Sequence, residues 1–212
     1  MSTSKTRPNK ICKILKAIYP GVKTQLNCCN PFELLVATIL SAQCTDKQVN
    51  TVTSVLFKKL ATPADLAAAS LDEIETLIRP TGYFRNKAKN IKNCSRMLVE
   101  KYKSKVPATL DELVALPGVG RKTANVVLGA AFGIPGIVVD THVARISKRL
   151  GLTQNNDPVK IEFDLMNIIP KEDWSDFSLR LIFFGRSICK ARKPRCPSCP
   201  LNELCDYPHK TM

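Results

Sequence analysis

Apolar residues recur at intervals of three and four along most of the chain, which is the pattern of helices that bury one face. The first clear stripe follows Asn30, whose side chain can cap a helix, and Pro31, which suits the first helical position. Its apolar members are Phe32, Leu35, Val36, Ile39 and Leu40. No convincing run shows the alternating pattern of a half-buried strand. The chain is therefore expected to be all-α, with short loops.

Other helix starts are marked by residues that accept hydrogen bonds from free backbone N–H groups, some with a partner acid or a following proline. These are Asp46, Ser70 with Glu73, Thr109 with Glu112, and Asp157 with Pro158. Two further apolar stripes have helical spacing: Ala88, Ile91, Cys94, Leu98 and Tyr102 on a basic helix, and Trp174, Phe177, Leu181, Phe184 and Ile188 near the C-terminus. No internal repeat, long linker or low-complexity tract interrupts the series.

Length and composition describe a folded globular chain. It has 212 residues, of which 44% are hydrophobic and 24% are charged, so it can bury a core and is not disordered. No apolar run reaches the roughly 18 residues of a membrane helix, because glycines and a proline interrupt the best candidate, residues 126–139. The polar first ten residues do not resemble a signal peptide. We therefore expect neither membrane insertion nor secretion.

Basic residues exceed acidic ones, 32 against 18, and the excess is gathered in three blocks. Residues 79–105 hold nine basic residues and one acid, residues 121–149 five and one, and residues 180–195 six and none. Gathered charge of this kind is typical of a surface that binds a polyanion. A general excess that only favours solubility is the alternative. Since no membrane anchor competes, nucleic acid is the favoured partner.

A Pro-Gly-Val-Gly turn joins the short helix that starts at Thr109 to a helix that opens at Arg121. Gly118 and Gly120 permit a tight turn that exposes its backbone N–H groups. At a helix N-terminus such groups bind anions, and Arg121 adds positive charge. A Pro-Gly turn alone is common, but the three parts together are typical of a helix-hairpin-helix, a clamp for the DNA backbone that does not read base sequence.

Lys122 follows this turn and is a candidate nucleophile. Arg121 and the positive end of the helix disfavour its ammonium form, and a neutral amine can form a Schiff base. Asp140 is the only acid between Glu112 and Asp157, so it is the candidate for stabilising positive charge. The structural alternatives are a solvated lysine and a carboxylate that caps a helix.

The nine cysteines fall into two groups. Five are scattered, and the odd total argues against a disulfide framework and for a reducing compartment. The others are Cys189, Cys196, Cys199 and Cys205, separated by six, two and five residues. This clustering strongly indicates a metal site, and the spacing permits either zinc or a [4Fe-4S] cluster. The metal would fix the first gap as a surface for phosphates. The basic residues of that gap are Lys190, Arg192, Lys193 and Arg195.

Taken together, these motifs resemble the endonuclease III family of DNA glycosylases over nearly the whole chain. The resemblance rests on four segments: Ser41-Ala42-Gln43 with Thr45-Asp46, residues 116–125, Val139–His142, and the four clustered cysteines. It implies two helical domains. One is a helical barrel at residues 24–134, and the other joins residues 1–23 to residues 135–212 and holds a [4Fe-4S] cluster.

The resemblance also implies base excision repair of double-stranded DNA by a monomeric, cytoplasmic enzyme of the bacterial type. Lys122 would attack the sugar of an oxidised pyrimidine and release the base, while Asp140 would stabilise positive charge on that sugar. Elimination of the 3′ phosphate would then cut the strand at the abasic site. Gln43 would fill the gap left by the flipped base, and Tyr83 stands where the family carries an apolar wedge. The larger, partly polar tyrosine departs from that pattern.

Two rival hypotheses remain at this point. An adenine glycosylase of the same superfamily would lack the hairpin lysine and carry a further C-terminal domain, whereas Lys122 is present and seven residues follow Cys205. A non-enzymatic, metal-stabilised DNA-binding module would use the hairpin, the basic blocks and the metal site. Such a module would leave Lys122 and Asp140 without a role.

Overall fold

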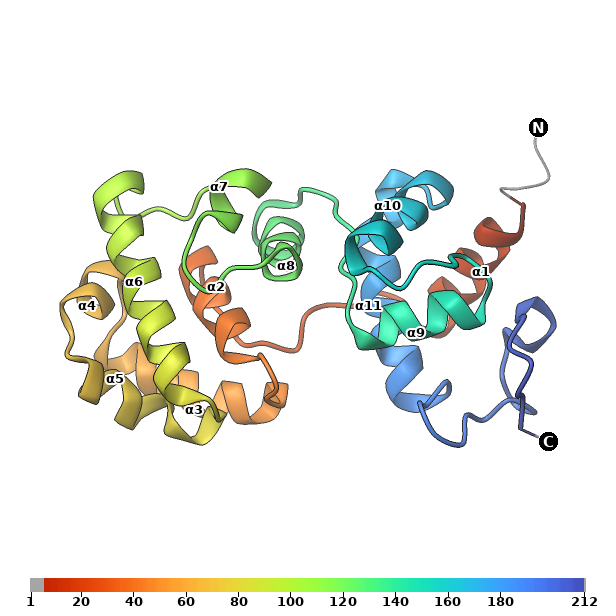
Figure 1. Cartoon of the computed structure of the whole chain (residues 1–212), viewed down its shortest axis with the longest axis horizontal. Coiled ribbons are helices and arrows are strands. Elements are labelled where there is room, and N and C mark those ends of the chain that lie inside the picture. Colours follow the sequence, from red (N-terminus) through yellow and green to blue (C-terminus); the bar gives the residue numbers. More distant parts are fainter. Residues whose placement is uncertain (1–5, 212) are drawn as a thin grey trace. The chain divides into compact units, whose positions relative to one another are not determined.

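The computed structural model describes residues 6–211, which form helices joined by loops, without a strand (Figure 1). The all-α prediction is confirmed. Within the described residues, the chain divides into two compact units. The continuous unit spans Thr24–Ile134, and the split unit joins the segment up to Lys23 with the segment from Pro135 onward. None of the helices that the structure describes is long and apolar enough to cross a membrane.

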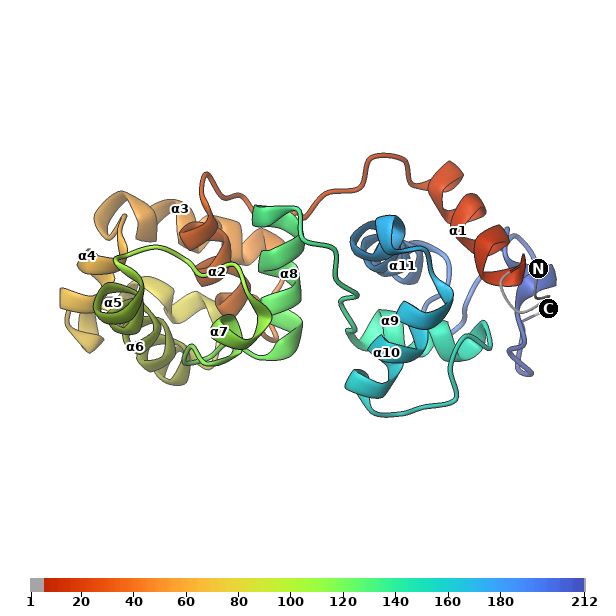
Figure 2. The same cartoon turned by 90° about the horizontal axis from the view of Figure 1, so that it is seen from above.

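In the continuous unit, a long basic helix packs across the shorter ones. Its elements are α2 (Pro31–Leu40), α3 (Asp46–Lys59), α4 (Pro63–Ala68), α5 (Leu71–Ile78), the 3-10 helix η2 (Arg79–Thr81), α6 (Phe84–Tyr102), α7 (Leu110–Val114) and α8 (Arg121–Phe132). Helix α6 packs against α4 and α5, and α2 packs against α8 (Figure 2). The core between them is mainly aliphatic and includes Leu35, Leu56, Ile91 and Leu98. The apolar stripes predicted for α2 and α6 are buried, except that Tyr102 is half-buried.

The split unit builds one core from both ends of the chain. Its elements are α1 (Thr6–Ile18), α9 (Thr141–Arg149), α10 (Pro158–Ile168), the 3-10 helix η3 (Lys171–Asp173), α11 (Trp174–Ser187) and the 3-10 helix η4 (Asn202–Leu204). Helix α11 packs against both α9 and α1. Ile11 and Leu15 of α1 are buried in the same apolar cluster as Phe177 and Phe184 of α11.

Local capping chemistry sets most helix starts. Asn30 and Asp157 cap α2 and α10 through their side chains, as predicted. The prediction that Asp46 caps α3 is wrong. Thr45 is the cap, because its hydroxyl accepts the N–H of Gln48, and Asp46 is the first helical residue. Both residue types cap helices well, so the sequence alone does not separate two adjacent candidates.

The predicted capping boxes are only partly formed. Ser70 caps α5 through its side chain. Thr109 caps α7, but the carboxylate of Glu112 accepts a hydrogen bond from the Thr109 hydroxyl at 2.5 Å. The reciprocal box instead occurs at the start of α4, between Thr62 and Asp65, where none was predicted.

Candidate nucleic-acid interface and metal centre

The hairpin between α7 and α8 makes a tight turn whose backbone requires glycine at Gly118 but not at Gly120. Gly118 has a φ of 78°, and a Cβ there would lie 2.7 Å from the Cβ of Asn90 on α6. Gly120 is the N-cap of α8 with an ordinary extended conformation, and open space surrounds the position that a Cβ would take. Between them, Val119 is buried and donates its N–H to the carbonyl oxygen of Leu116 at 3.1 Å. The hairpin is therefore anchored by its valine while both glycines remain exposed.

Lys122 and Asp140 mark the starts of two helices that belong to different units. Lys122 is the second residue of α8 and is exposed, and Arg121 before it is half-buried. Asp140 caps α9, because its Oδ1 accepts the N–H groups of His142 and Val143, each at 2.8 Å. The cap alternative for Asp140 is confirmed. Only one of its two carboxylate oxygens takes part in this cap.

Beyond this cap, α9 leads to the cysteine segment. Arg145 lies with Nη2 3.2 Å from His142 Nδ1 and donates a hydrogen bond to the carbonyl oxygen of Cys189 at 2.9 Å. His142 also lies against Gly185 of α11, where an added Cβ would come within 2.5 Å of Nδ1. The histidine is therefore part of the contact between α9 and α11.

Gln43 and Tyr83 share an unusual backbone conformation. Both are exposed, Tyr83 to 67%, and both have a positive φ, 53° and 48°. Residues other than glycine rarely adopt this conformation, and such outliers gather at functional positions. Gln43 lies in the turn after α2, and Tyr83 directly precedes α6. Lys193, in the segment between the first two clustered cysteines, shares the feature with a φ of 49°.

The four clustered cysteines face one cavity. They line it together with the apolar side chains of Ile146, Leu150, Phe184 and Leu201. None of the four thiols is in a disulfide. Among residues 6–211, no three potential ligands are grouped closely enough to hold a single metal ion. A cavity bounded by four cysteine sulfurs fits an iron–sulfur cluster in its donor set.

Arg149 of α9 holds the segment that follows Cys189, a contact that was not predicted from the sequence. Its side chain is only 9% exposed. Nη1 donates to Cys189 Sγ at 3.3 Å and to the carbonyl oxygen of Lys190 at 2.8 Å. Nη2 donates to the carbonyl oxygen of Ala191 at 3.0 Å, and the guanidinium lies over the ring of Tyr207. An N–H donor to a cysteine sulfur suits a ligating thiolate.

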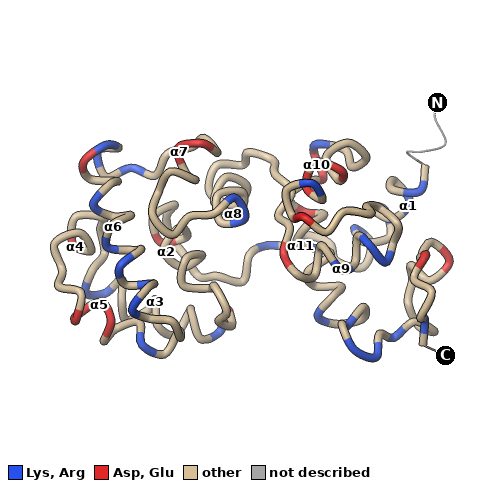
Figure 3. The backbone as a smooth tube through the Cα atoms, in the orientation of Figure 1, with Lys and Arg blue, Asp and Glu red and all other residues tan. Residues whose placement is uncertain are grey.

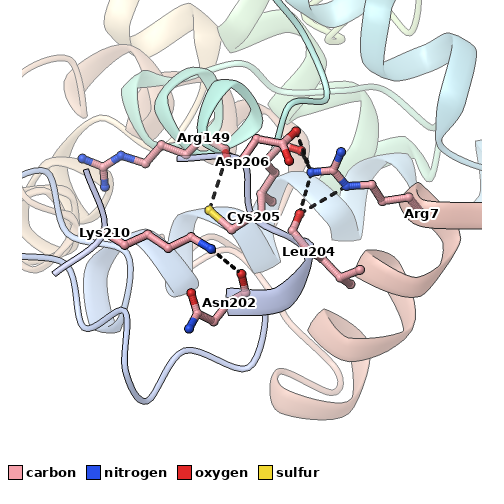
Figure 4. A network of polar contacts seen from close by, with 8 residues as sticks. Arg7, Arg149, Asn202, Leu204, Cys205, Asp206 and Lys210 are labelled. Atoms are coloured by element: carbon pink, nitrogen blue, oxygen red, sulfur yellow. Dashed lines mark hydrogen bonds and ion pairs between the residues drawn. The ribbon is translucent and has the colours of Figure 1, made fainter. Parts of the chain in front are cut away.

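A second set of contacts ties the far end of the cysteine segment to α1 and α9 (Figure 4). Arg7 donates to the carbonyl oxygen of Leu204 at 2.7 Å and forms an ion pair with Asp206 at 2.7 Å. Cys205 Sγ lies 3.3 Å from the carbonyl oxygen of Arg149. Both ends of the cysteine segment are thus held by arginines, one from each half of the split unit.

Basic residues lie along α6 and in the segment that follows α11 (Figure 3). We call residues 190–195 the cluster loop. Its four predicted phosphate ligands, Lys190, Arg192, Lys193 and Arg195, are all exposed. The loop backbone is held by Arg149 and by a hydrogen bond from the Arg195 N–H to the Ile188 carbonyl oxygen at 3.1 Å. The loop therefore presents four cations on an anchored backbone.

Comparison with known proteins identifies relatives over almost the whole chain. Residues 36–171 match the HhH-GPD superfamily of base excision DNA repair proteins, and residues 189–205 match the iron-sulfur binding domain of endonuclease III. Endonuclease III of Synechocystis sp. is 53% identical, with 97% of this chain and 94% of the relative covered. Endonuclease III of Bacillus subtilis is 55% identical, with 89% of this chain and 86% of the relative covered.

Solved structures agree with this assignment. An endonuclease III trapped as a covalent intermediate with DNA has a TM-score of 0.91 and 51% identity, covering 97% of this chain and 96% of that one. A thermostable thymine-DNA glycosylase, 24% identical, shares the fold with a TM-score of 0.87 and covers 97% of this chain and 98% of its own. These findings do not favour a non-enzymatic binding module. The chain belongs to the endonuclease III family of base excision DNA glycosylases with abasic-site lyase activity, and its cofactor is a [4Fe-4S] cluster.

Proposed function

We propose that this enzyme removes oxidised pyrimidines from double-stranded DNA and cuts the strand at the resulting abasic site through a lysine Schiff base. The observation that carries the proposal is the position of Lys122, an exposed amine in the first turn of α8, directly after the hairpin. A hairpin that binds the phosphate backbone through its N–H groups would bring a neighbouring sugar to this amine. The related endonuclease III trapped covalently on DNA supports a nucleophile in this family.

The chemistry needs a nucleophile and a negative charge. Lys122 Nζ attacks C1′ of the sugar, and the bond to the base breaks with its electron pair leaving on the base. Transfer of a proton from this nitrogen to O4′, as the bond between C1′ and O4′ breaks, opens the sugar ring and gives the protonated imine. Asp140 stabilises positive charge on the sugar and assists these proton transfers. Its Oδ1 is anchored by two N–H groups, which orients the carboxylate. Removal of a proton from C2′ then expels the 3′ phosphate and nicks the strand.

The flipped base leaves a gap, and we assign Gln43 and Tyr83 to the opened duplex. The amide of Gln43 can donate and accept hydrogen bonds, so it suits different orphaned bases. The exposed ring of Tyr83 can wedge between bases and hold the DNA bent. The strained backbone at both positions supports a functional role.

The metal centre has a structural role in this proposal. Four cysteine ligands, Cys189, Cys196, Cys199 and Cys205, form a closed set that leaves no position for substrate. The bound cluster would supply folding free energy to the segment that carries the cluster loop. The four cations of that loop bind phosphates without reading bases.

The two units would act as the two domains of the enzyme, which we propose works as a monomer in the cytoplasm. We propose that it acts on chromosomal DNA, which is supported by the bacterial source of its relatives.

Borohydride trapping tests the nucleophile. Wild-type enzyme should give a covalent adduct on a duplex that carries an abasic site or an oxidised pyrimidine, without added metal, and Lys122→Gln should give none. Lys47 is the matched control, because it is an exposed lysine at the second position of α3 in the same unit. Lys47→Gln should trap normally. Undiminished trapping by Lys122→Gln would remove Lys122 from this role.

The role of Asp140 is tested by Asp140→Asn. Asparagine caps helices as well as aspartate does, so the start of α9 should be kept while the negative charge is lost. We expect DNA binding to persist and base release to slow by about a hundredfold or more. Unchanged base release would contradict the electrostatic role.

A further inference from the structure

Lys87 is a buried cation that the proposed chemistry does not use. It lies in the first turns of α6 and is only 5% exposed. Lysine is almost never buried to this degree without partners. Its Nζ donates to the carbonyl oxygen of Leu40 at 2.9 Å and to the carbonyl oxygen of Thr81 at 2.7 Å. Burial lowers the pKa of Lys87, because the protein around it solvates the ammonium less well than water does. The two carbonyl oxygens therefore supply the polar contacts of the buried ammonium.

The two acceptors are both helix ends. Leu40 is the last residue of α2, and Thr81 is the last residue of η2. The final carbonyl groups of a helix lack partners within it and carry partial negative charge. One ammonium group therefore donates hydrogen bonds to the C-terminal ends of α2 and η2 and links both to the start of α6.

The residues that follow these two carbonyls are the proposed duplex-opening pair. Gln43 comes three residues after Leu40, and Tyr83 two residues after Thr81. Both connections are short and hydrogen-bonded. The first turn is closed by the bond from Cys44 N–H to the Ser41 carbonyl oxygen at 3.1 Å.

The second turn is closed on both sides of the tyrosine. Gly82 N–H donates to the Arg79 carbonyl oxygen at 3.3 Å, and the backbone N–H of Lys87 donates to the Tyr83 carbonyl oxygen at 3.1 Å. The tyrosine thus sits one turn of helix before the lysine. A shift of the Lys87 ammonium group would therefore move the two turns that carry the exposed side chains of Gln43 and Tyr83.

We propose that Lys87 is a positioning residue that sets the spacing between Gln43 and Tyr83, so that the two side chains enter the base stack together. The inference rests on the proposed insertion of these two residues. Opening a duplex costs stacking energy, and inserted side chains help to hold the opened, kinked duplex. A buried anchor holds that spacing before DNA binds, which lowers the ordering cost of binding.

Lys92 supplies the matched comparison. It lies on the same helix, five residues further on, and its Nζ donates to the carbonyl oxygens of Ala67 and Ala69 at the end of α4. Its environment therefore repeats the chemistry of Lys87 at a helix end that carries no proposed DNA-inserting residue. Loss of either ammonium should weaken the fold in the same way, but only Lys87 should affect duplex opening.

The experiment compares Lys87→Met with Lys92→Met, because methionine keeps much of the apolar stem and removes the ammonium. Two rates are measured for each: base release from an oxidised pyrimidine in duplex DNA, and Schiff-base trapping at an abasic site in a single strand. The ratio of the first to the second should fall about ten- to a hundredfold for Lys87→Met. It should stay at the wild-type value for Lys92→Met. Equal ratios in the two variants would overturn the inference.

Combination with the inserted residues separates this inference from the proposal it rests on. If Gln43→Ala and Tyr83→Ala lower the ratio, then adding Lys87→Met to the double variant should lower it no further. An additional loss of similar size would show that Lys87 acts elsewhere. If the two alanine variants leave the ratio unchanged, the proposed insertion is wrong and the inference is overturned with it.

A milder variant keeps the test open if Lys87→Met does not fold. Lys87→Gln can still donate to one of the two carbonyls and should keep more of the fold. Its ratio should lie between those of wild type and of the Gln43→Ala, Tyr83→Ala double variant. A wild-type ratio in folded Lys87→Gln would contradict the role.

Discussion

Replacing each hairpin glycine with alanine distinguishes the position that stabilises the fold from the position that contributes to DNA binding. At Gly118 the alanine must adopt a φ of 78°, and its Cβ would lie 2.7 Å from the Cβ and 3.0 Å from the Cγ of Asn90. The left-handed conformation costs a residue with a Cβ about 1–2 kcal/mol. Neither clashing Cβ can move without its backbone, and overpacking of this kind costs about 1–3 kcal/mol.

Gly118→Ala should therefore lower the free energy of unfolding by about 2–5 kcal/mol. Gly120→Ala should cost at most about 1 kcal/mol, because φ is −89° there and no heavy atom of another part of the chain lies within 4 Å of the new Cβ. That open space is where a phosphate would meet the hairpin N–H groups. A methyl group there should weaken DNA binding while leaving the fold intact.

The assay is urea unfolding followed by circular dichroism, paired with affinity for an abasic-site duplex at fixed salt. Adding Asn90→Gly to Gly118→Ala should recover the part of the loss that comes from the clash, but not the part that comes from φ. Equal unfolding free energies for Gly118→Ala and Gly120→Ala would refute the packing argument. Full DNA affinity in Gly120→Ala would show that the hairpin does not hold a phosphate.

Three further outcomes follow from the structure. Arg149→Met removes two hydrogen bonds to cluster-loop carbonyls, each worth about 1.5–3 kcal/mol. The visible absorbance of the cluster should therefore be lost at a lower urea concentration than in wild type. Lys148→Met, at the exposed neighbouring position, should match wild type. Lys193→Ala should reduce the slope of log affinity against log salt by about 1, whereas Lys160→Ala should not, because it lies in residues 157–176, which hold six acids and two lysines. Equal slopes would mean that the loop does not bind DNA. Burial raises the pKa of the Cys94 thiol from 9.0 to about 12, so its stabilisation is complete below pH 9 and is lost as the pH rises towards 12. The loss amounts to at most about 1.4 kcal/mol per pH unit, and Cys94→Ala should flatten the alkaline decline in unfolding free energy; parallel declines would contradict this.

Local structures that depend only on neighbouring residues could be predicted from the sequence. The hairpin follows from its glycines, and the caps at Asn30 and Asp157 follow from one side chain and a proline. The choice between Thr45 and Asp46 could not be predicted, because it depends on where the preceding turn closes. The left-handed conformation of Gln43 was not predicted either, since glutamine carries no preference for it.

Contacts that join distant segments were not predictable in the same way. Lys87 reaches a carbonyl 47 residues away, and Arg149 reaches loop carbonyls 41 and 42 residues away. In the sequence each is one basic residue within a basic block. A weak signal existed for Lys87, because it precedes Ile91 by four residues and so falls on the apolar face of α6. Periodicity placed it on the buried face, but only the fold shows which carbonyl groups lie there.

The contact between Arg7 and Leu204 imposes an order on biosynthesis. The two residues are 197 positions apart, which at about 5–20 residues per second separates their emergence from the ribosome by on the order of 10–40 s. The continuous unit meets no such delay, since all of its core residues lie between Thr24 and Ile134. Helix α1 is made before the other described helices, yet Ile11 and Leu15 cannot pack against α11 until residues 174–187 have been made. The continuous unit can therefore fold during synthesis before the two segments of the split unit pack together.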